Sequence, residues 1–145
     1  LAGGDPLEQS RDRSYKGKWN TTANEADLEN VIETKKRMGD KPVIAVITLK
    51  NPMVMAELEP YTDAILVEYG VSADAVTDVL TGAFEPEGLL PVQMPADMDT
   101  VEEQCEDVAF DMRCYEDSEG HVYDFGFGLN YKGVIWDERT KRYVK

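Results

Sequence analysis

The first half of the chain alternates between two patterns of apolar residues. Over residues 26–38, apolar side chains recur every three or four positions with charged residues between them, which predicts a helix. Asn24 is placed to cap this helix and Gly39 to end it. The second pattern is an unbroken apolar run at residues 43–49 and again at 64–69. Such runs predict strands buried on both faces, as in a parallel sheet covered by helices.

Further helices are predicted between and after these strands. A short helix is expected at residues 53–58, ending before Pro60. Ser72 can cap another helix at 73–80, which Gly82 would end. The resulting order of helix, strand, helix, strand and helix predicts an α/β domain with parallel strands and right-handed crossovers.

The second half of the chain has weaker patterns. Residues 97–117 are strongly acidic with a weak helical pattern, and they are expected to form a long surface excursion. Residues 122–129 predict a last strand or extended segment, residues 134–136 a short edge strand, and the basic tail a solvated end. Residues 1–23 contain glycine, proline and a polar basic run, which predicts an irregular segment.

Charge narrows the classes of function. The 145 residues include 29 acidic and 15 basic side chains, for a net charge of −14. This charge would repel phosphate backbones and anionic lipids, so neither a nucleic acid nor a membrane is expected as a partner. No apolar run approaches the roughly 20 residues of a membrane helix. The chain begins at Leu1, and it is expected to be a piece of a longer protein.

Several common sites can be set aside. The sequence has no GxxxxGK[ST] phosphate loop, no GxSxG nucleophile elbow and no GxGxxG that follows a strand. Cys105 and Cys114 are expected to be ordinary thiols, and His121, in a turn-like stretch, an ordinary surface residue. One histidine and two cysteines without CxxC spacing do not support a zinc site. Carboxylates remain, but 29 of them produce many accidental pairs, so composition identifies no site.

Three segments together carry a resemblance. They are KPVIAVITLKNPMVM at 41–55, DAILVEYGVSADAVTDVLTGAFEPEGLLPVQMP at 63–95 and YDFGFGLNY at 123–131. Their order and spacing resemble the C-terminal α/β sandwich domain of glycoside hydrolase family 3, whose members include β-glucosidases. The resemblance implies a layered sandwich with a mostly parallel, buried sheet flanked by helices, here truncated. Its motif residues are expected to be structural rather than catalytic.

The chain also departs from the family's pattern. The loop GVSADA has a single glycine where the family has several, Asn130 replaces the usual serine, and residues 97–117 are an elaboration. The resemblance therefore implies membership of a subgroup, and it does not specify the sugar.

The resemblance further implies a retaining mechanism with two carboxylates. One would be an aspartate nucleophile on a TIM-type barrel that precedes this domain, and 145 residues are too few to contain that barrel. The acid/base glutamate of many members lies in a Glu-x-Ser-x-Arg-like context, which EQSRDR at 8–13 matches. Glu8 is therefore the candidate acid/base, and Arg13 and Asp5 are candidate substrate-binding residues. Asp5 is also the second candidate for the acid/base. The alternative that Glu8 is an ordinary loop carboxylate stays open.

These expectations divide the chain into a loop segment at 1–23, which carries the candidate acid/base, and an α/β sandwich domain at 24–145. The expected partners are a carbohydrate substrate and the barrel domain, and the carboxylate chemistry needs no cofactor or metal. A non-catalytic α/β interaction or carbohydrate-binding module is the alternative, since fold does not fix function. A periplasmic or extracellular location is expected, with a cytoplasmic one left open.

Overall fold

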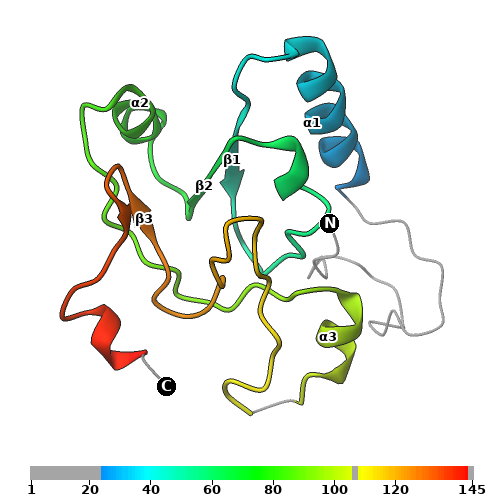
Figure 1. The fold of residues 1–145 in the computed structure, drawn as a ribbon, viewed down its shortest axis with the longest axis vertical. Coiled ribbons are helices and arrows are strands. Elements are labelled where there is room, and N and C mark those ends of the chain that lie inside the picture. The colour runs from blue at the N-terminus through cyan, green and yellow to red at the C-terminus, as the bar shows by residue number, and fades with distance from the viewer. Residues whose placement is uncertain (1–23, 106–107, 144–145) are drawn as a thin grey trace.

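The computed structural model describes residues 24–105 and 108–143, with helices on both sides of a small parallel sheet (Figure 1). In chain order its elements are α1 (Glu25–Met38), β1 (Ile44–Thr48), the 3₁₀ helix η1 (Glu59–Tyr61), β2 (Ala64–Glu68), α2 (Ala73–Thr81), α3 (Met98–Glu103), β3 (Leu129–Asn130), β4 (Gly133–Val134) and the 3₁₀ helix η2 (Thr140–Arg142).

The two long helices are the ones that periodicity predicts. α2 begins at Ser72, whose hydroxyl accepts a hydrogen bond from the Ala75 amide at 3.3 Å. It ends at Gly82, which adopts a left-handed conformation with φ of 80°. α1 begins after Asn24, but the Asn24 side chain makes no capping hydrogen bond, so that detail of the prediction is wrong.

The predicted parallel pairing of strands is confirmed. β1 and β2 pair in parallel from Ile44 opposite Ala64 to Thr48 opposite Glu68. One face of this pair, formed by Ala45, Ile47, Ile65 and Val67, packs on the hydrophobic core. The domain is therefore of the α/β class.

The predicted burial of β1 on both faces is wrong for the described part of the chain. Burial alternates along the strand, and the side chains of Ile44 and Val46 on its outer face are 46% and 43% exposed. The continuous apolar run correctly marked a strand, but the described elements cover only its inner face.

The core lies under the inner face of the sheet. Leu49, Met53, Met55, Leu58 and Met94 form the buried cluster there. The short helix expected at 53–58 is absent, and the segment instead turns into η1, which contains Pro60. Four side chains of this segment are buried, and those of Met53, Met55 and Leu58 belong to the core cluster.

In the second half of the chain, three extended segments lie side by side. The Met94 amide donates to the Tyr123 carbonyl at 3.0 Å, and the Met94 carbonyl accepts from the Tyr115 amide at 2.9 Å. The Tyr123 amide donates to the Tyr115 carbonyl at 2.8 Å, which closes the set. The segment expected to be a last strand is thus extended, and β3 and β4 form a short antiparallel pair beyond it.

The long acidic excursion contains a helix that its pattern barely indicated. α3 begins at Asp97, whose carboxylate accepts hydrogen bonds from the amide and the hydroxyl of Thr100, both at 2.8 Å. Thr100 is buried, so this cap fixes the start of the helix to the body of the domain. The structure assigns no disulfide to Cys105 and Cys114.

Two glycines of the YDFGFGLNY segment are required by close packing. A Cβ on Gly128 would lie 2.2 Å from the Gly88 carbonyl oxygen, and one on Gly126 would lie 2.2 Å from the Tyr143 ring. Gly126 also has a φ of 79°, which side chains disfavour. The two motif segments meet here, since the Leu90 amide donates to the Phe127 carbonyl at 2.7 Å. This geometry supports the expectation that the motifs are scaffold.

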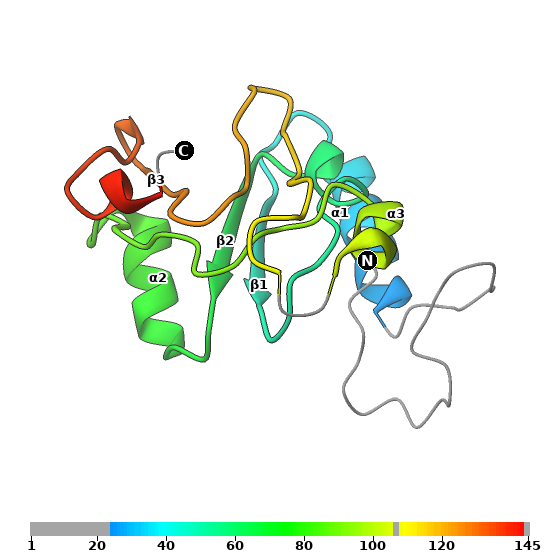
Figure 2. The ribbon, with the colours of Figure 1, turned by 90° about the horizontal axis from the view of Figure 1, so that it is seen from below.

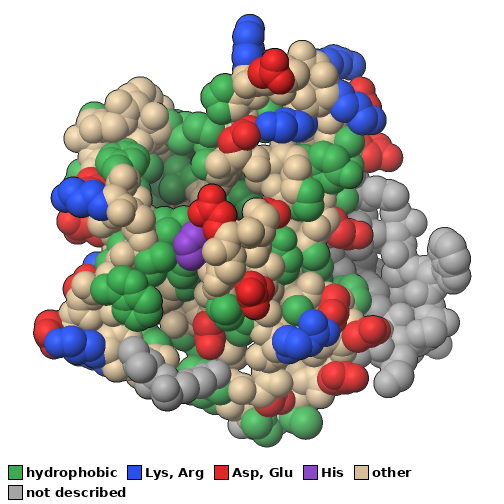
Figure 3. All heavy atoms as spheres, viewed as in Figure 1, with side chains coloured by type: hydrophobic (Ala, Val, Ile, Leu, Met, Phe, Trp, Pro, Cys, Tyr) green, Lys and Arg blue, Asp and Glu red, His purple; other side chains and the backbone are tan. Residues whose placement is uncertain are grey.

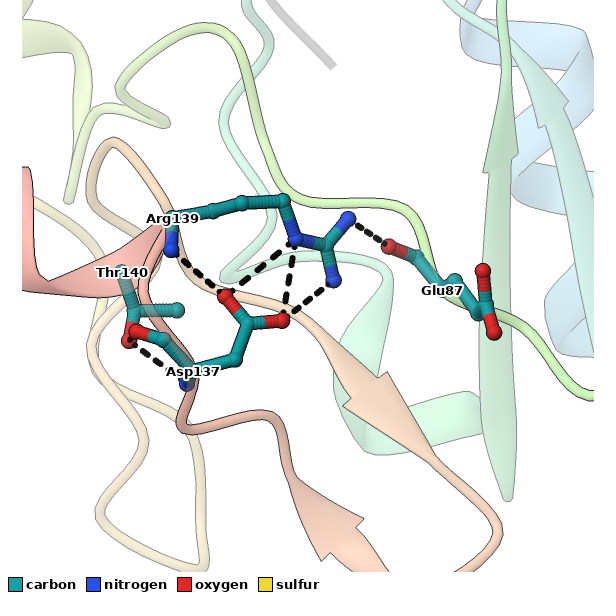
Figure 4. Close-up of polar contacts among 4 residues, drawn as sticks. All are labelled: Glu87, Asp137, Arg139 and Thr140. Atoms are coloured by element: carbon teal, nitrogen blue, oxygen red, sulfur yellow. Dashed lines mark hydrogen bonds and ion pairs between the residues drawn. The ribbon is translucent and has the colours of Figure 1, made fainter.

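The C-terminal tail is fastened to the domain rather than solvated throughout (Figure 4). The Arg139 guanidinium donates to both carboxylate oxygens of Asp137 and to the Glu87 carbonyl oxygen at 2.9 Å. The hydrogen bond from Arg139 lowers the pKa of Asp137. Thr140 is buried and also bonds Asp137. The other described residues of the tail, 138–139 and 141–143, are exposed, so the prediction of a solvated tail is wrong only for Thr140.

Replacing Gly128 with alanine is expected to lower the free energy of unfolding by about 1–3 kcal/mol, because the new methyl group overlaps the Gly88 carbonyl. Gly88→Ala is the matched control, since a Cβ there meets no atom within 4 Å. Urea unfolding of both variants checks this. Equal loss of stability in the two variants would contradict the packing account.

Candidate functional site

The structure places none of the catalytic residues expected from sequence. Glu8, Arg13 and Asp5 lie outside the described residues. Within the described part of the chain, two groups of polar side chains have the geometry of a candidate site. One lies at the carboxyl end of β2 and the other on the hairpin around residues 116–122.

The first group centres on Glu68, at the end of the sheet where ligands bind in open α/β folds. Its carboxylate accepts hydrogen bonds from the Thr48 hydroxyl and from the amides of Gly70 and Val71. These bonds lower the pKa of Glu68, and the bond from the Thr48 hydroxyl has the largest effect. A general acid needs a raised pKa, so this carboxylate is suited to holding the turn after β2 and not to protonating a leaving group.

The second group is an aspartate and a histidine in contact inside a hairpin. Asp117, whose side chain is 8% exposed, accepts from the amides of Glu119 and His121 at 2.9 and 2.8 Å. Its other oxygen lies 3.0 Å from Nδ1 of His121. Burial by itself would raise the pKa of Asp117, but the hydrogen bonds from the His121 amide and ring and the Glu119 amide outweigh it and lower that pKa.

Aromatic rings enclose this pair. The His121 ring stacks on Phe127 at 5.6 Å, and Phe127 stacks on Tyr123 at 5.1 Å between ring centres. Tyr123 also hydrogen-bonds Asp117, and its burial raises the pKa of its hydroxyl well above the usual value. The hydroxyls of Tyr115 and Ser118 donate to the Glu59 carboxylate, which ties the hairpin to η1.

His121 was expected to be an ordinary surface residue, and this prediction is wrong. Its side chain is 21% exposed and is held on one side by Asp117. The sequence signal was the Asp-x-x-x-His spacing around the turn at Gly120, which lets the aspartate reach both the amide and the ring of the histidine. With its Nδ1 directed at a carboxylate, the imidazole has a fixed orientation.

The face of the molecule drawn in Figure 3 carries both acidic and basic side chains and is hollowed in one place. Figure 3 shows acidic side chains spread over this face, and hydrophobic side chains lining the hollow. In the part of the chain that the structure describes, no three histidine, cysteine, aspartate or glutamate residues gather to hold a metal ion. No helix among residues 24–105 and 108–143 is long and apolar enough to span a membrane.

Comparison with known proteins identifies the family. Residues 3–131 match the Glycosyl hydrolase family 3 C-terminal domain, so the chain belongs to this family. The match includes both motif segments that the structure brings together and the segment that carries Asp5, Glu8 and Arg13.

Individual relatives agree with the family assignment. The chain is 40% identical over 91 residues to beta-glucosidase C of Emericella nidulans, which is 63% of this chain and 14% of that protein. It is 39% identical over 100 residues to probable beta-glucosidase C of Aspergillus oryzae, covering 69% and 15% of the two chains. It is 24% identical over 106 residues to periplasmic beta-glucosidase of Salmonella typhimurium, covering 63% and 14%.

The chain therefore spans about one seventh of the length of the curated relatives it matches. No solved structure matches it significantly.

Asp117→Asn is expected to lower the free energy of unfolding by about 1–2 kcal/mol at neutral pH, because it removes charge-assisted hydrogen bonds from a buried carboxylate. The pKa of Asp117 is lower in the folded protein than in the unfolded chain, where it is near 4. The stabilisation by ionised Asp117 is therefore complete above the unfolded pKa, and it is lost as the pH falls through the pKa of the folded protein. Wild type and variant should converge in acid. Glu119→Gln, on a side chain 78% exposed, is the control. A gap between wild type and Asp117→Asn that does not narrow in acid would contradict this account.

Proposed function

We propose that the chain is the C-terminal part of a retaining glycoside hydrolase that cleaves β-glucosides or related β-linked sugars. The family match over residues 3–131 supports this proposal, as do three relatives that are each named as a beta-glucosidase. In the intact enzyme, residues 24–145 would belong to a larger layered α/β sandwich, and residues 1–23 would form a loop at the active site.

The proposed chemistry is shared between two domains. A TIM-type barrel that precedes this domain would supply the aspartate nucleophile, and the sandwich would supply part of the active-site wall. The two carboxyl groups of a retaining glycosidase lie about 5–5.5 Å apart, so both domains must close on the same sugar. The carboxylates perform the reaction, and the proposal includes no cofactor or metal.

The pKa directions of the described carboxylates bear on where the acid/base residue lies. Every described carboxylate with a shifted pKa has it lowered by hydrogen bonds, as for Glu33, Asp63, Glu68, Asp97, Asp117 and Asp137. A glycosidase acid/base must instead hold its proton near neutral pH. None of these six groups is suited to that role, and the resemblance of residues 8–13 to the family's Glu-x-Ser-x-Arg-like context supports the segment 1–23 as its source.

Within that segment we assign Glu8 as the acid/base. Partial burial against the barrel would raise its pKa, as a general acid requires. Arg13 would position a sugar hydroxyl or the glutamate itself, and Asp5 would contact the substrate. The proposed location is the periplasm or the extracellular space, which the name of the periplasmic Salmonella relative supports.

Glu8→Gln in the full-length enzyme is expected to lower the turnover of an aryl β-glucoside with a poor leaving group by about 10²–10⁴-fold, because the leaving oxygen is no longer protonated. Azide should restore turnover of an aryl β-glucoside with a good leaving group, because that leaving group departs without a proton and azide attacks the accumulated glycosyl-enzyme intermediate without base assistance. Glu119→Gln, which makes the same change at an exposed side chain of the sandwich, is the control.

Near wild-type turnover of Glu8→Gln, with no effect of azide, would contradict the assignment. Loss of turnover with azide rescue in Asp5→Asn, and not in Glu8→Gln, would instead identify Asp5 as the acid/base.

A further inference from the structure

The start of α1 lies at the same end of the parallel sheet as the carboxyl ends of β1 and β2. Lys35, in the last turn of α1, donates to the carboxylate of Asp63 at 2.6 Å, and Asp63 immediately precedes β2. The helix therefore ends beside the amino ends of the strands, and its 14 residues extend about 21 Å toward their carboxyl ends. In Figure 2 the arrowheads of both strands point toward the end of the domain at which α1 begins.

The segment that carries the proposed acid/base joins the described chain at this end of the sheet, because α1 begins after Asn24. A general acid contacts the leaving-group oxygen of the glycoside, whereas the nucleophile of a retaining enzyme attacks the anomeric carbon from the opposite side. If the acid/base comes from this segment, the described side chains at this end of the sheet lie on the leaving-group side of the sugar. They are the side chains that would contact the aglycone.

The turn after β2 presents an aromatic ring at this end. Tyr69 directly follows the strand, and its side chain is 50% exposed. The Glu68 carboxylate accepts hydrogen bonds from the amides of Gly70 and Val71, and Gly70 turns the chain with a φ of 91°. The capping hydroxyl of Ser72 then begins α2. The residues on both sides of Tyr69 are thus fixed, which gives its ring the preorganised support that a binding residue needs.

Tyr69 and Val71 provide the apolar surface of this end of the sheet. Val71 is 54% exposed, so the apolar surface continues past Gly70. The turn after β1 is different, because the two residues that follow Leu49 are the exposed and polar Lys50 and Asn51. Ligand sites combine aromatic surface with a few polar groups that orient the ligand. An apolar, planar group therefore packs on the turn after β2 and not on the turn after β1.

We propose that Tyr69 is a specificity-determining residue of the intact enzyme, and that its ring stacks on the aglycone of an aryl β-glucoside. The inference rests on the proposed function, and it names the residue through which the sandwich forms its part of the active-site wall. Aromatic rings prefer offset or edge-to-face contact with one another, and such contact adds to the burial of apolar area. Tyr69 thus favours an aryl leaving group over a small alkyl one.

Binding of two sulfur-linked ligands to the full-length enzyme tests this stacking. Phenyl and methyl β-thioglucoside share the sugar and differ only in the aglycone, and their sulfur linkage resists hydrolysis. Tyr69→Ala is expected to raise the Kd of the phenyl ligand by about 3–10-fold and to keep that of the methyl ligand within about twofold, because only the phenyl ligand loses an aromatic contact. Tyr69→Phe keeps the ring and should keep both constants. NMR titration measures all of them.

Tyr61→Ala is the matched control, because Tyr61 is an exposed tyrosine that precedes β2, at the other end of the sheet. An unchanged ratio of the two Kd values in Tyr69→Ala would overturn the inference, while hydrolysis by the same protein would leave the proposed function standing. A changed ratio in a protein that hydrolyses no β-glucoside would support the inference and contradict the proposed reaction. Failure of the wild type to bind either ligand would overturn both.

Discussion

The two halves of the domain are joined through Met94. Its side chain is fully buried in the cluster under the parallel sheet, while its amide and carbonyl bond the backbones of Tyr123 and Tyr115. One residue thereby fixes the extended second half of the chain to the inner face of β1 and β2. An unbranched, flexible side chain suits this position, because it can fill the irregular space between the sheet and the turn at Met55. The hairpin with Asp117 and His121 depends on this junction for its position.

The acidic side chains of the described region mainly organise its turns. Glu68 holds the loop after β2, Asp97 begins α3, Asp117 closes the hairpin and Asp137 fastens the tail. Each accepts hydrogen bonds that favour its ionised form. These carboxylates are consequently committed to structure. These four carboxylates are therefore unsuited to donate the proton of the proposed reaction.

The parts of the fold that sequence predicted are those with a local cause. α1, α2 and the parallel strands follow from periodicity, unbroken apolar runs and the cap at Ser72. The turn at residues 53–58, the exposed outer face of β1 and the pairing of Asp117 with His121 depend on contacts between distant segments, which no local pattern contains. The candidate catalytic residue Glu8 lies outside the described residues, so its assignment is supported by resemblance to the family and not by geometry.

The central claim is that this family 3 domain completes an active site whose nucleophile lies on another domain. The most direct measurement compares hydrolysis of an aryl β-glucoside by the purified 145-residue chain with hydrolysis by the same chain joined to its upstream polypeptide. The account predicts no turnover above buffer for the chain alone and clear turnover for the joined protein. Measurable turnover by the chain alone, lost on Glu8→Gln, would contradict the two-domain account, and so would a joined protein that binds sugars without cleaving them.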